Sequence, residues 1–270
     1  MTPEHFTFMQ GFLKERSGLV LGNDKGYLLE SRLTPIARRH DIKDLDELVA
    51  KAMSAPTEAL LVDITEAMTT NESFFFRDQK PFDLFENHVL PHLLEHRAIT
   101  KAFRIWSAAA SSGQESYSLA MILKEQAAKI PGWRTEIFGT DLSSEIIRKA
   151  ENGLYTQFEV QRGMPITLLV KYFDKIDDQW QIKPEVRQMI KYRIYNLLSD
   201  LKPLGKFDVV FCRNVLIYFD QPTKSAVLEQ VAGLMPDDGF LFLGGAETVL
   251  GITDKFAPVP GQRGIYKKTE

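Results

Sequence analysis

The feature that most constrains the fold of this chain is the segment from Phe103 to Glu125, FRIWSAAASSGQESYSLAMILKE. It begins with a short apolar run typical of a buried strand, continues with small residues from Ala108 to Gly113, and ends with apolar side chains at helical spacing. A strand, a small-residue loop and a helix open a doubly wound α/β domain, in which ligands bind where the carboxyl ends of strands meet helix N-termini. The segment therefore predicts a Rossmann-like α/β domain with a ligand site at this loop.

The residues of the loop indicate which ligand it can hold. Small side chains let a ligand approach the backbone closely, and Gly113 can adopt a conformation closed to other residues. The segment lacks the G-x-G-x-x-G fingerprint of dinucleotide-binding proteins and the lysine of a phosphate-binding loop. Glu115, at the start of the helix, can accept hydrogen bonds from ribose hydroxyls but would repel a phosphate. We therefore expect a nucleoside without a phosphate.

The α/β pattern continues along the chain. Residues 136–140 form a predicted strand that ends at Asp141, and Ser143 or Ser144 is expected to cap the next helix. An acidic residue at the end of the second strand suits a ribose diol, although a helix-capping Asp is equally consistent with the spacing. Further strands are predicted at residues 207–211, 239–243 and 264–267.

Residues 153–195 interrupt this pattern. A helix near residues 165–173 is followed by strand-like stretches at 180–183 and 190–195. We predict that this region is an insertion with a small antiparallel sheet of its own.

The first 75 residues are predicted to form an all-helical domain, because apolar side chains recur at helical spacing in stretches separated by turn signals. Pro35 is expected to kink or break the second helix. The basic side chains there include Arg32, Arg38 and Arg39. They form either a solvated helix face or a docking face for an acidic helical partner.

Two stretches between these domains have ambiguous patterns. TTNESFFFRD, residues 69–78, holds consecutive phenylalanines that fit neither amphipathic period, so at least one must face something other than the main core. The stretch is either a structural junction or part of a site. In the helix that follows, His88, His92 and His96 share one face. Their spacing could bind a metal, but Pro91 and the absence of a nearby ligand motif favour an exposed face, and we predict no metal site.

Composition limits the class of protein. With 270 residues the chain can bury a sizeable core, and its net charge of −3 argues against a general nucleic-acid binder. We find no membrane-span or signal-peptide pattern, and the single Cys212, expected to be a buried inert thiol, excludes an internal disulfide. These features predict a soluble cytoplasmic protein without membrane insertion.

Four motifs occur in order along the chain: TNESFFFR, SAAASSGQESYSLA, GTDLS and FCRNVLIYF. Together they closely resemble those of the chemotaxis receptor methyltransferases, the CheR family, and the resemblance covers nearly the whole chain. It implies S-adenosylmethionine (SAM) as methyl donor, S-adenosylhomocysteine (SAH) as product, and methyl-ester formation on glutamates of chemoreceptor cytoplasmic helices. It also implies a helical receptor-docking domain at 1–75, a connecting helix at 76–98, and a Rossmann-like SAM-methyltransferase domain at 99–270 with an inserted β-subdomain at about 174–195.

Matched motif by motif, the resemblance also implies site residues. The cofactor-binding set is Asn71, Ser73, Arg77, Ala109, Glu115, Asp141, Asn196, Leu197, Arg213 and Asn214. The catalytic candidates are Arg77 and Tyr218, and the receptor-docking candidates are Arg32, Arg38 and Arg39. Some positions depart from the family pattern. Gln114 and Ser116 replace the more usual Glu and Pro, and Thr34-Pro35 stands where relatives often carry arginines on the docking helix.

The implied chemistry agrees with these residue types. A glutamate side chain has a pKa of about 4.3, so it is ionised at neutral pH and needs no general base. Arg77 and the Tyr218 hydroxyl are expected to hold the acceptor carboxylate, unless Arg77 contacts the cofactor's carboxylate instead. Two alternatives are a small-molecule SAM methyltransferase and a SAM-binding sensor or adaptor without turnover.

Receptors are held by some relatives through a C-terminal pentapeptide tether that binds the β-subdomain. The corresponding loop here, residues 173–180, is short, lacks glycine and is acidic at Asp174, Asp177 and Asp178. An acidic tail would be repelled there. We therefore expect recognition of the methylation helices through Arg32, Arg38 and Arg39, without dependence on the tether, for a cytoplasmic enzyme recruited to membrane receptor arrays.

Overall fold

The computed structural model describes residues 1–269 and divides the chain into two compact units. The first comprises Met1–Thr70 and a distant segment, Tyr218–Lys224. The second comprises Asn71–Ile217 and the residues from Ser225 onward. The helical unit therefore ends at Thr70 and not at 75, so the whole NESFFFR stretch belongs to the second unit. No helix within residues 1–269 is both long and apolar enough to cross a membrane.

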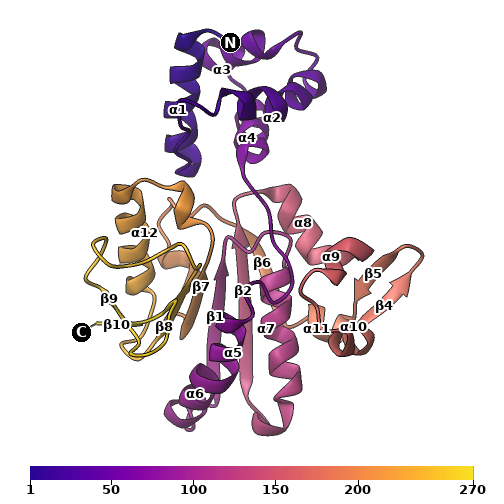
Figure 1. Cartoon of the computed structure of the whole chain (residues 1–270), viewed down its shortest axis with the longest axis vertical. Coiled ribbons are helices and arrows are strands. Elements are labelled where there is room, and N and C mark those ends of the chain that lie inside the picture. Colours follow the sequence, from indigo (N-terminus) through magenta and orange to yellow (C-terminus); the bar gives the residue numbers. More distant parts are fainter. Residues whose placement is uncertain (270) are drawn as a thin grey trace. The chain divides into compact units, whose positions relative to one another are not determined.

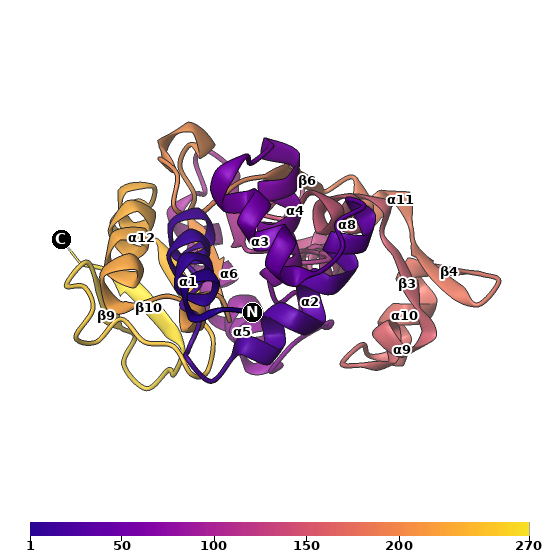
Figure 2. The ribbon, with the colours of Figure 1, turned by 90° about the horizontal axis from the view of Figure 1, so that it is seen from above.

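The first unit is built from helices, as the sequence predicts. They are α1 (Pro3–Ser17), α2 (Gly26–Arg39), α3 (Leu45–Ser54) and α4 (Glu58–Met68), all visible in Figure 2. Thr2, Asp44 and Thr57 cap α1, α3 and α4 through side-chain oxygens that accept backbone N–H groups. The apolar stripes meet in a core that includes the fully buried Leu29 and Leu33. α2 runs through Pro35, so a break at this residue is wrong, and a kink there stays a prediction.

The segment Tyr218–Lys224 is held in the helical unit by polar contacts. The Val20 backbone N–H donates to the Tyr218 carbonyl at 2.9 Å, and Lys14 Nζ lies 2.6 Å from Asp220 Oδ2. The bond from Lys14 is the largest cause that lowers the pKa of the Asp220 carboxyl, to about 2. The end of the RNVLIY motif is thus part of the helical unit.

Within residues 71–269 the main sheet has the order β6-β2-β1-β7-β8-β10-β9 (Figure 1). Its parallel strands are β1 (Ala102–Ala108), β2 (Arg134–Asp141), β6 (Ile190–Ile194), β7 (Val209–Cys212) and β8 (Phe240–Leu243). The strands β10 (Ile265–Lys268) and β9 (Phe256–Pro258) add antiparallel. Every residue of β7 and β8 is buried, as expected for parallel strands covered on both faces.

Helices position the sheet and its loops. On one side α7 (Gln114–Glu125) and α8 (Ser144–Asn152) both contact β2 and β6. The helix α12 (Gln221–Gly233) follows β7 along the chain and contributes buried Val227, Leu228 and Val231.

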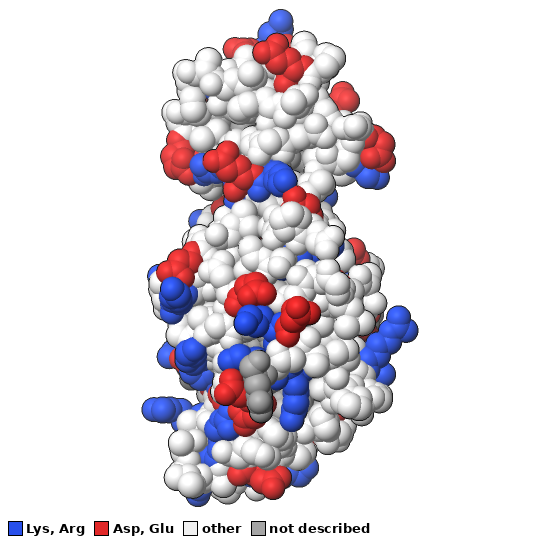
Figure 3. All heavy atoms as spheres, turned by 90° about the vertical axis from the view of Figure 1, so that its left-hand side faces the viewer, with Lys and Arg blue, Asp and Glu red and all other residues white. Residues whose placement is uncertain are grey.

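On the face shown in Figure 3, acidic and basic side chains lie close to one another, so neither sign of charge forms a continuous patch.

The connecting helix predicted around Pro91 is three consecutive elements. They are α5 (Lys80–Leu84), the π-helical η1 (Phe85–Val89) and α6 (Leu90–His96). Pro91 lies in the first turn of α6, directly after the π-helix, where its missing N–H is tolerated. The His92 and His96 rings stack with centroids 3.8 Å apart. Among residues 1–269 no group of three or more His, Cys, Asp or Glu side chains could hold a metal ion.

The small sheet of the insertion lies within the predicted region 153–195, but it begins earlier than the subdomain bounds of about 174–195. This antiparallel sheet has the order β3-β5-β4, formed by β3 (Leu154–Thr156), β5 (Gln179–Ile182) and β4 (Phe173–Ile176). It is accompanied by α9 (Gln157–Gln161), α10 (Ile166–Tyr172) and α11 (Pro184–Arg187). Figures 1 and 2 show α9, α10 and β4 together at one side of the unit.

One strand that the sequence pattern assigns to this insertion belongs to the main sheet instead. Ile190–Ile194 pairs in parallel with β2 and forms the edge of the main sheet, so the boundary of the insertion at 195 is wrong. A strand pattern reveals that a segment is extended but not which strand it pairs with, because the pairing depends on distant packing. Here Tyr192 packs against Gly139 of β2 and against the start of α7.

Candidate functional site

The loop after β1 is anchored to the end of β2. Ser111 donates its backbone N–H to Asp141 Oδ2 at 2.9 Å, and Ala110 donates to the Thr140 carbonyl at 2.8 Å. The backbone is left-handed at Ala109 (φ 55°) and Ser111 (φ 51°), a conformation that costs free energy unless other bonds hold it. Asp141 therefore holds this loop in its left-handed conformation.

Asp141 also serves the neighbouring helix. Its Oδ1 accepts the backbone N–H of Ser143 at 3.0 Å, and Ser143 itself caps α8, as one of the two predicted serines. The side chain of Asp141 is buried. One carboxylate thus fixes the loop after β1 and the entry to α8, and these two segments border the site where the sequence places a nucleoside.

Gly113, at the N-terminal boundary of α7, is required by both conformation and space. Its φ is 92°, and a Cβ there would lie 2.6 Å from the Tyr192 hydroxyl oxygen. Tyr192 comes from β6, the strand at the edge of the main sheet. The close packing at this helix N-terminus therefore depends on the position of β6.

A buried arginine connects Glu115 to the segment that contains Arg77. Arg213 Nη1 lies 3.0 Å from Glu115 Oε2, and Nη2 donates to Asp78 Oδ2 at 2.8 Å and to the Arg77 carbonyl at 2.9 Å. The exposed fraction of the side chain is 1% for Arg213 and 12% for Glu115. The other Glu115 oxygen accepts the Ser107 hydroxyl at 2.7 Å.

This arrangement gives Arg213 a definite structural role. A buried guanidinium is costly unless it is paired and hydrogen-bonded, and two carboxylates compensate it here. The sequence singled out Arg213 and Glu115 as cofactor residues but did not reveal that they pair with each other. Arg213 Nε is buried and has no hydrogen-bond partner within residues 1–269, so one donor of this group is left over.

The NESFFFR stretch folds back onto α7. Phe75 and Phe76 are buried in the main core, and Phe76 donates its backbone N–H to the Ser118 hydroxyl at 3.0 Å. Phe74 is the phenylalanine that faces elsewhere, as expected for at least one of the three. The guanidinium carbons of Arg77 and Arg162 lie 5.5 and 4.3 Å from its ring centroid.

One end of this stretch contacts the loop after β1. The Asn71 carbonyl accepts the Ser111 hydroxyl at 3.0 Å, and Ser73 is half-buried. The Arg77 side chain donates from Nη1 to the Glu72 carbonyl at 2.8 Å. The contact of Asn71 with Ser111 joins the 71–77 segment to the loop after β1, whereas the bond of Arg77 lies within the segment.

The remaining predicted cofactor residues follow β6 and β7. Asn196 and Leu197 come shortly after β6, where Asn196 Oδ1 accepts the Leu198 backbone N–H at 3.0 Å and Leu197 is buried. Asn214 follows β7 in a left-handed conformation with φ 59°. Of the predicted set, Ala109, Asp141, Asn196, Leu197, Arg213 and Asn214 therefore lie at or shortly after the carboxyl ends of parallel strands, the position expected for a ligand site in this fold.

The predicted docking residues and Tyr218 lie in the helical unit. Arg32 donates to the carbonyls of Met68 and Thr69 at 2.7 and 3.1 Å and thereby caps the C-terminus of α4. Arg39 pairs with Asp63 at 3.6 Å, whereas Arg38 is exposed and makes no ion pair within residues 1–269. Of the three arginines, Arg38 is best placed to meet a partner.

A cavity of about 770 Å³ lies beside the carboxyl ends of β7 and β8. Arg77, Lys80 and Arg263 contribute basic side chains to its wall, and none of them forms an ion pair within residues 1–269. The acidic side chains of the wall already have partners: Asp78 pairs with Arg213, and Glu247 accepts backbone N–H groups. The available charge in this cavity is therefore positive.

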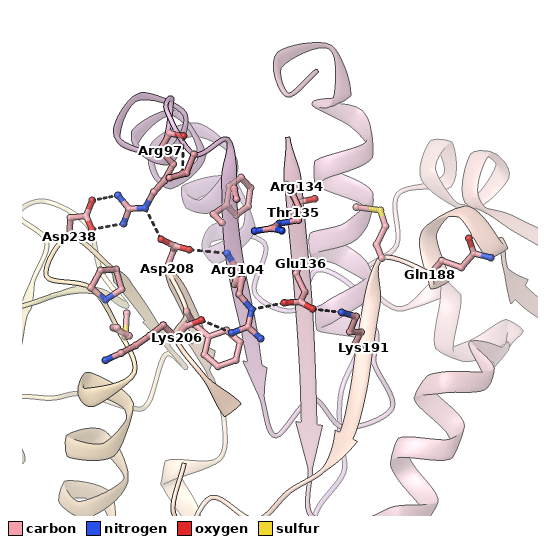
Figure 4. A pocket seen from close by; sticks show the side chains of 17 residues that line it. Arg97, Arg104, Arg134, Thr135, Glu136, Gln188, Lys191, Lys206, Asp208 and Asp238 are labelled. Atoms are coloured by element: carbon pink, nitrogen blue, oxygen red, sulfur yellow. Dashed lines mark hydrogen bonds and ion pairs between the residues drawn. The ribbon is translucent and has the colours of Figure 1, made fainter. Parts of the chain in front are cut away.

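A second cavity, of about 990 Å³, lies at the opposite end of the sheet, by the amino ends of β1 and β2. Figure 4 shows two groups of paired charged side chains in it: Arg97 contacts Asp208 and Asp238, and Glu136 contacts Arg104 and Lys191. These pairs tie strands and loops together. The cavity contains none of the residues predicted to bind the cofactor.

The residues at the carboxyl edge fit the nucleoside donor SAM. The acids Glu115 and Asp141 border a loop of small residues whose backbone a ligand can approach closely, and a lysine for phosphate is absent from the loop after β1. SAM carries a ribose and no phosphate, and its sulfonium is positive. A site for such a nucleoside at the carboxyl ends of a mostly parallel sheet indicates the class of SAM-dependent methyltransferases.

Comparisons with known families identify the particular group within this class. Residues 71–265 match the family model described as the SAM binding domain of CheR methyltransferases, and residues 4–69 match the all-alpha domain of CheR methyltransferases. The chain belongs to the CheR methyltransferase family. The resemblance, the fold class and SAM as cofactor are thereby confirmed.

Curated relatives cover nearly the whole chain. Chemotaxis protein methyltransferase 1 of Pseudomonas aeruginosa is 39% identical over 269 residues, which are 98% of this chain and 97% of the relative. Chemotaxis protein methyltransferase Cher2 of Pseudomonas putida is 38% identical over 258 residues, 94% of each chain. Chemotaxis protein methyltransferase 1 of Vibrio cholerae is 38% identical over 260 residues, 95% of this chain and 94% of the relative. These similarities place this methyltransferase in chemotaxis.

Proposed function

We propose that this enzyme transfers the methyl group of SAM to glutamate side chains of chemoreceptor cytoplasmic helices and forms methyl esters during chemotaxis adaptation. The observation that carries the proposal is the 770 Å³ cavity. The two carboxylates of its wall already have partners in the protein, whereas Arg77, Lys80 and Arg263 form no ion pair within residues 1–269 and are available to an anionic side chain. A carboxylate is the acceptor that such a wall selects.

The chemistry requires little from the protein beyond alignment and exclusion of water. The cofactor supplies a methyl group bonded to a sulfonium. An ionised glutamate oxygen forms the new O–C bond while the C–S bond breaks, and the electron pair of that bond stays on sulfur. No proton moves, so no general base is needed. Holding the reacting atoms in line can contribute about 7–11 kcal/mol to the lowering of the barrier.

The acceptor carboxylate must lose water before it reacts, which is costly without hydrogen bonds. We assign one donor to Arg77, which lines the cavity. The resemblance to the family implies the Tyr218 hydroxyl as a second donor. The cofactor is held by Asn71, Ser73, Ala109, Glu115, Asp141, Asn196, Leu197, Arg213 and Asn214.

Incubation with labelled SAM and candidate receptor cytoplasmic fragments tests the function. We expect label on the receptor fragment as a base-labile methyl ester, and no label on a fragment whose acceptor glutamates are changed to alanine. Binding of SAM without transfer to any fragment would favour the sensor or adaptor alternative. Transfer to a small molecule alone would favour the small-molecule methyltransferase.

For receptor docking we propose the exposed face of α2 around Arg38, together with Arg39. An acidic methylation helix complements these side chains, and recruitment to membrane arrays follows from binding the receptor. Arg32 contributes by holding α4, because its guanidinium already caps that helix.

The tether prediction is refined by the geometry of β4. This strand is an edge of its sheet, so its backbone is open to an added strand, and the hairpin to β5 turns tightly at Asp177 and Asp178 with Asp177 left-handed at φ 50°. Space therefore does not oppose a tether. Charge opposes it at the turn, because Asp177 and Asp178 are exposed there and would repel an acidic peptide; Asp174 is exposed too but lies 3.9 Å from Lys183.

Titration of a C-terminal receptor pentapeptide should show no binding at micromolar concentrations. Arg38→Glu should raise the KM for the receptor fragment, because it places a negative charge against an acidic helix. Micromolar binding of the pentapeptide that Arg38→Glu leaves unchanged would identify the β-subdomain as the docking site.

A further inference from the structure

Glu247, in the loop after β8, binds four backbone N–H groups with one carboxylate. Oε2 accepts from Asn214 at 2.7 Å and from Gly244 at 2.6 Å. Oε1 accepts from Val215 at 2.9 Å and from Ile217 at 3.2 Å. Hydrogen bonds to an ionised acceptor are about twice as strong as neutral ones, so this side chain joins the loops after β7 and β8 firmly.

Two backbone features depend on this carboxylate. Asn214 has a left-handed conformation that other bonds must hold, and its N–H is one of the four donors. At Gly244 a Cβ would lie 2.7 Å from Glu247 Oε2 and 2.7 Å from Asn214 Nδ2. The residue at 244 must therefore be glycine for the carboxylate to reach its donors.

The joined loops form a wall of the 770 Å³ cavity. Asn214, Gly244 and Glu247 all line it together with Arg77. Ile217, the fourth donor residue, immediately precedes Tyr218 in the chain. Because four N–H groups surround its oxygens, the carboxylate of Glu247 presents little negative potential to an acidic acceptor.

We propose that Glu247 is a positioning residue for methyl transfer: it fixes the RNVLI loop as the wall that aligns the acceptor carboxylate. The inference rests on the proposed function. Glu247 does not contact the reacting atoms. It acts through the backbone of Asn214, Val215 and Ile217.

Glu247→Gln tests the assignment. The amide NH₂ replaces one acceptor oxygen, so two of the four backbone donors then face another donor. A misplacement of about 1 Å can cost about 100-fold in rate, and we expect kcat for receptor methylation to fall by about that factor. The Kd of SAH should change far less than kcat, by about 3-fold or less, because Asn214 is the only one of the ten predicted cofactor residues, all within residues 1–269, that donates to Glu247. Glu95→Gln, which changes an exposed carboxylate on α6 in the same way, is the matched control and should leave both values unchanged.

Gly244→Ala provides an independent variant that keeps the charge. Its Cβ displaces the carboxylate, so the same fall in kcat with retained SAH binding is expected. Normal kcat in both variants overturns the proposal, as does a loss of SAH binding that accounts for the lost turnover. Failure of the wild-type enzyme to methylate any receptor fragment, with SAH binding intact, contradicts the proposed function instead.

Discussion

Asp141→Ala should weaken the binding of SAM and SAH by at least about 100-fold. The change removes the acceptor of the Ser111 and Ser143 backbone N–H groups. Each hydrogen bond to a charged group contributes about 1.5–3 kcal/mol, and loss of both frees a loop that is left-handed at Ala109 and Ser111. A ribose contact made by the same carboxylate would add to this loss. Isothermal titration calorimetry with SAH measures the effect.

Two further variants separate the causes of this loss. Asp141→Asn keeps one acceptor oxygen and should bind SAH with intermediate affinity. Asp44→Ala also removes a carboxylate that accepts a backbone N–H, but at the start of α3 in the helical unit, so SAH affinity should be unchanged. If Asp141→Ala bound SAH as wild type does, the cofactor site would lie elsewhere.

The α/β architecture was predictable because β7 and β8 are continuous apolar runs and the helices between strands are periodic. β1, β2, β7, β8 and β10 lie where those patterns indicated. The partner of residues 190–194 was not predictable, because a strand pattern does not determine which sheet the strand joins. β3 was missed since its residues 154–156 are too few to show an alternation.

The candidate site was predictable in its residue types and not in its contacts. Glu115, Asp141 and Arg213 follow small-residue loops or strand ends, which is a local signal. The bonds of Arg213 to Glu115 and Asp78 join positions far apart in the sequence, so no local pattern could reveal them. The bonds of Arg32 to the end of α4 also join positions far apart in the sequence. The sequence alone therefore shows Arg32 only as a basic side chain that could dock a partner.

Glu247 carried a weak signal that sequence reasoning overlooked. It follows Gly244 by three residues directly after a buried strand, a spacing that lets a carboxylate accept the glycine N–H, as it does at 2.6 Å. An acid three residues after a glycine is common by chance. Its three other donors come from the loop after β7 and are visible only in the fold.

Arg77→Ala should reduce receptor methylation by at least about 100–1000-fold while the fold stays intact by circular dichroism. Removing one donor aimed at a reacting oxygen has effects of this size in other enzymes. The fold does not need this side chain, because Phe75 and Phe76 are buried in the core and Arg213 binds the carbonyl of residue 77, which alanine retains. Arg77→Lys keeps the charge but not the planar fork of donors, and should recover only part of the activity.

Arg162→Ala is the control that separates a catalytic role from a structural one. Arg162 stacks on Phe74 even more closely than Arg77 does, at 4.3 Å against 5.5 Å, and it pairs with Glu72 at 2.7 Å. If turnover depended only on packing around Phe74, Arg162→Ala would therefore lose at least as much turnover as Arg77→Ala. We expect near-normal turnover from Arg162→Ala, since its side chain does not line the 770 Å³ cavity. Equal losses in the two variants, or near-normal turnover of Arg77→Ala, would show that the FFFR segment is only a structural junction.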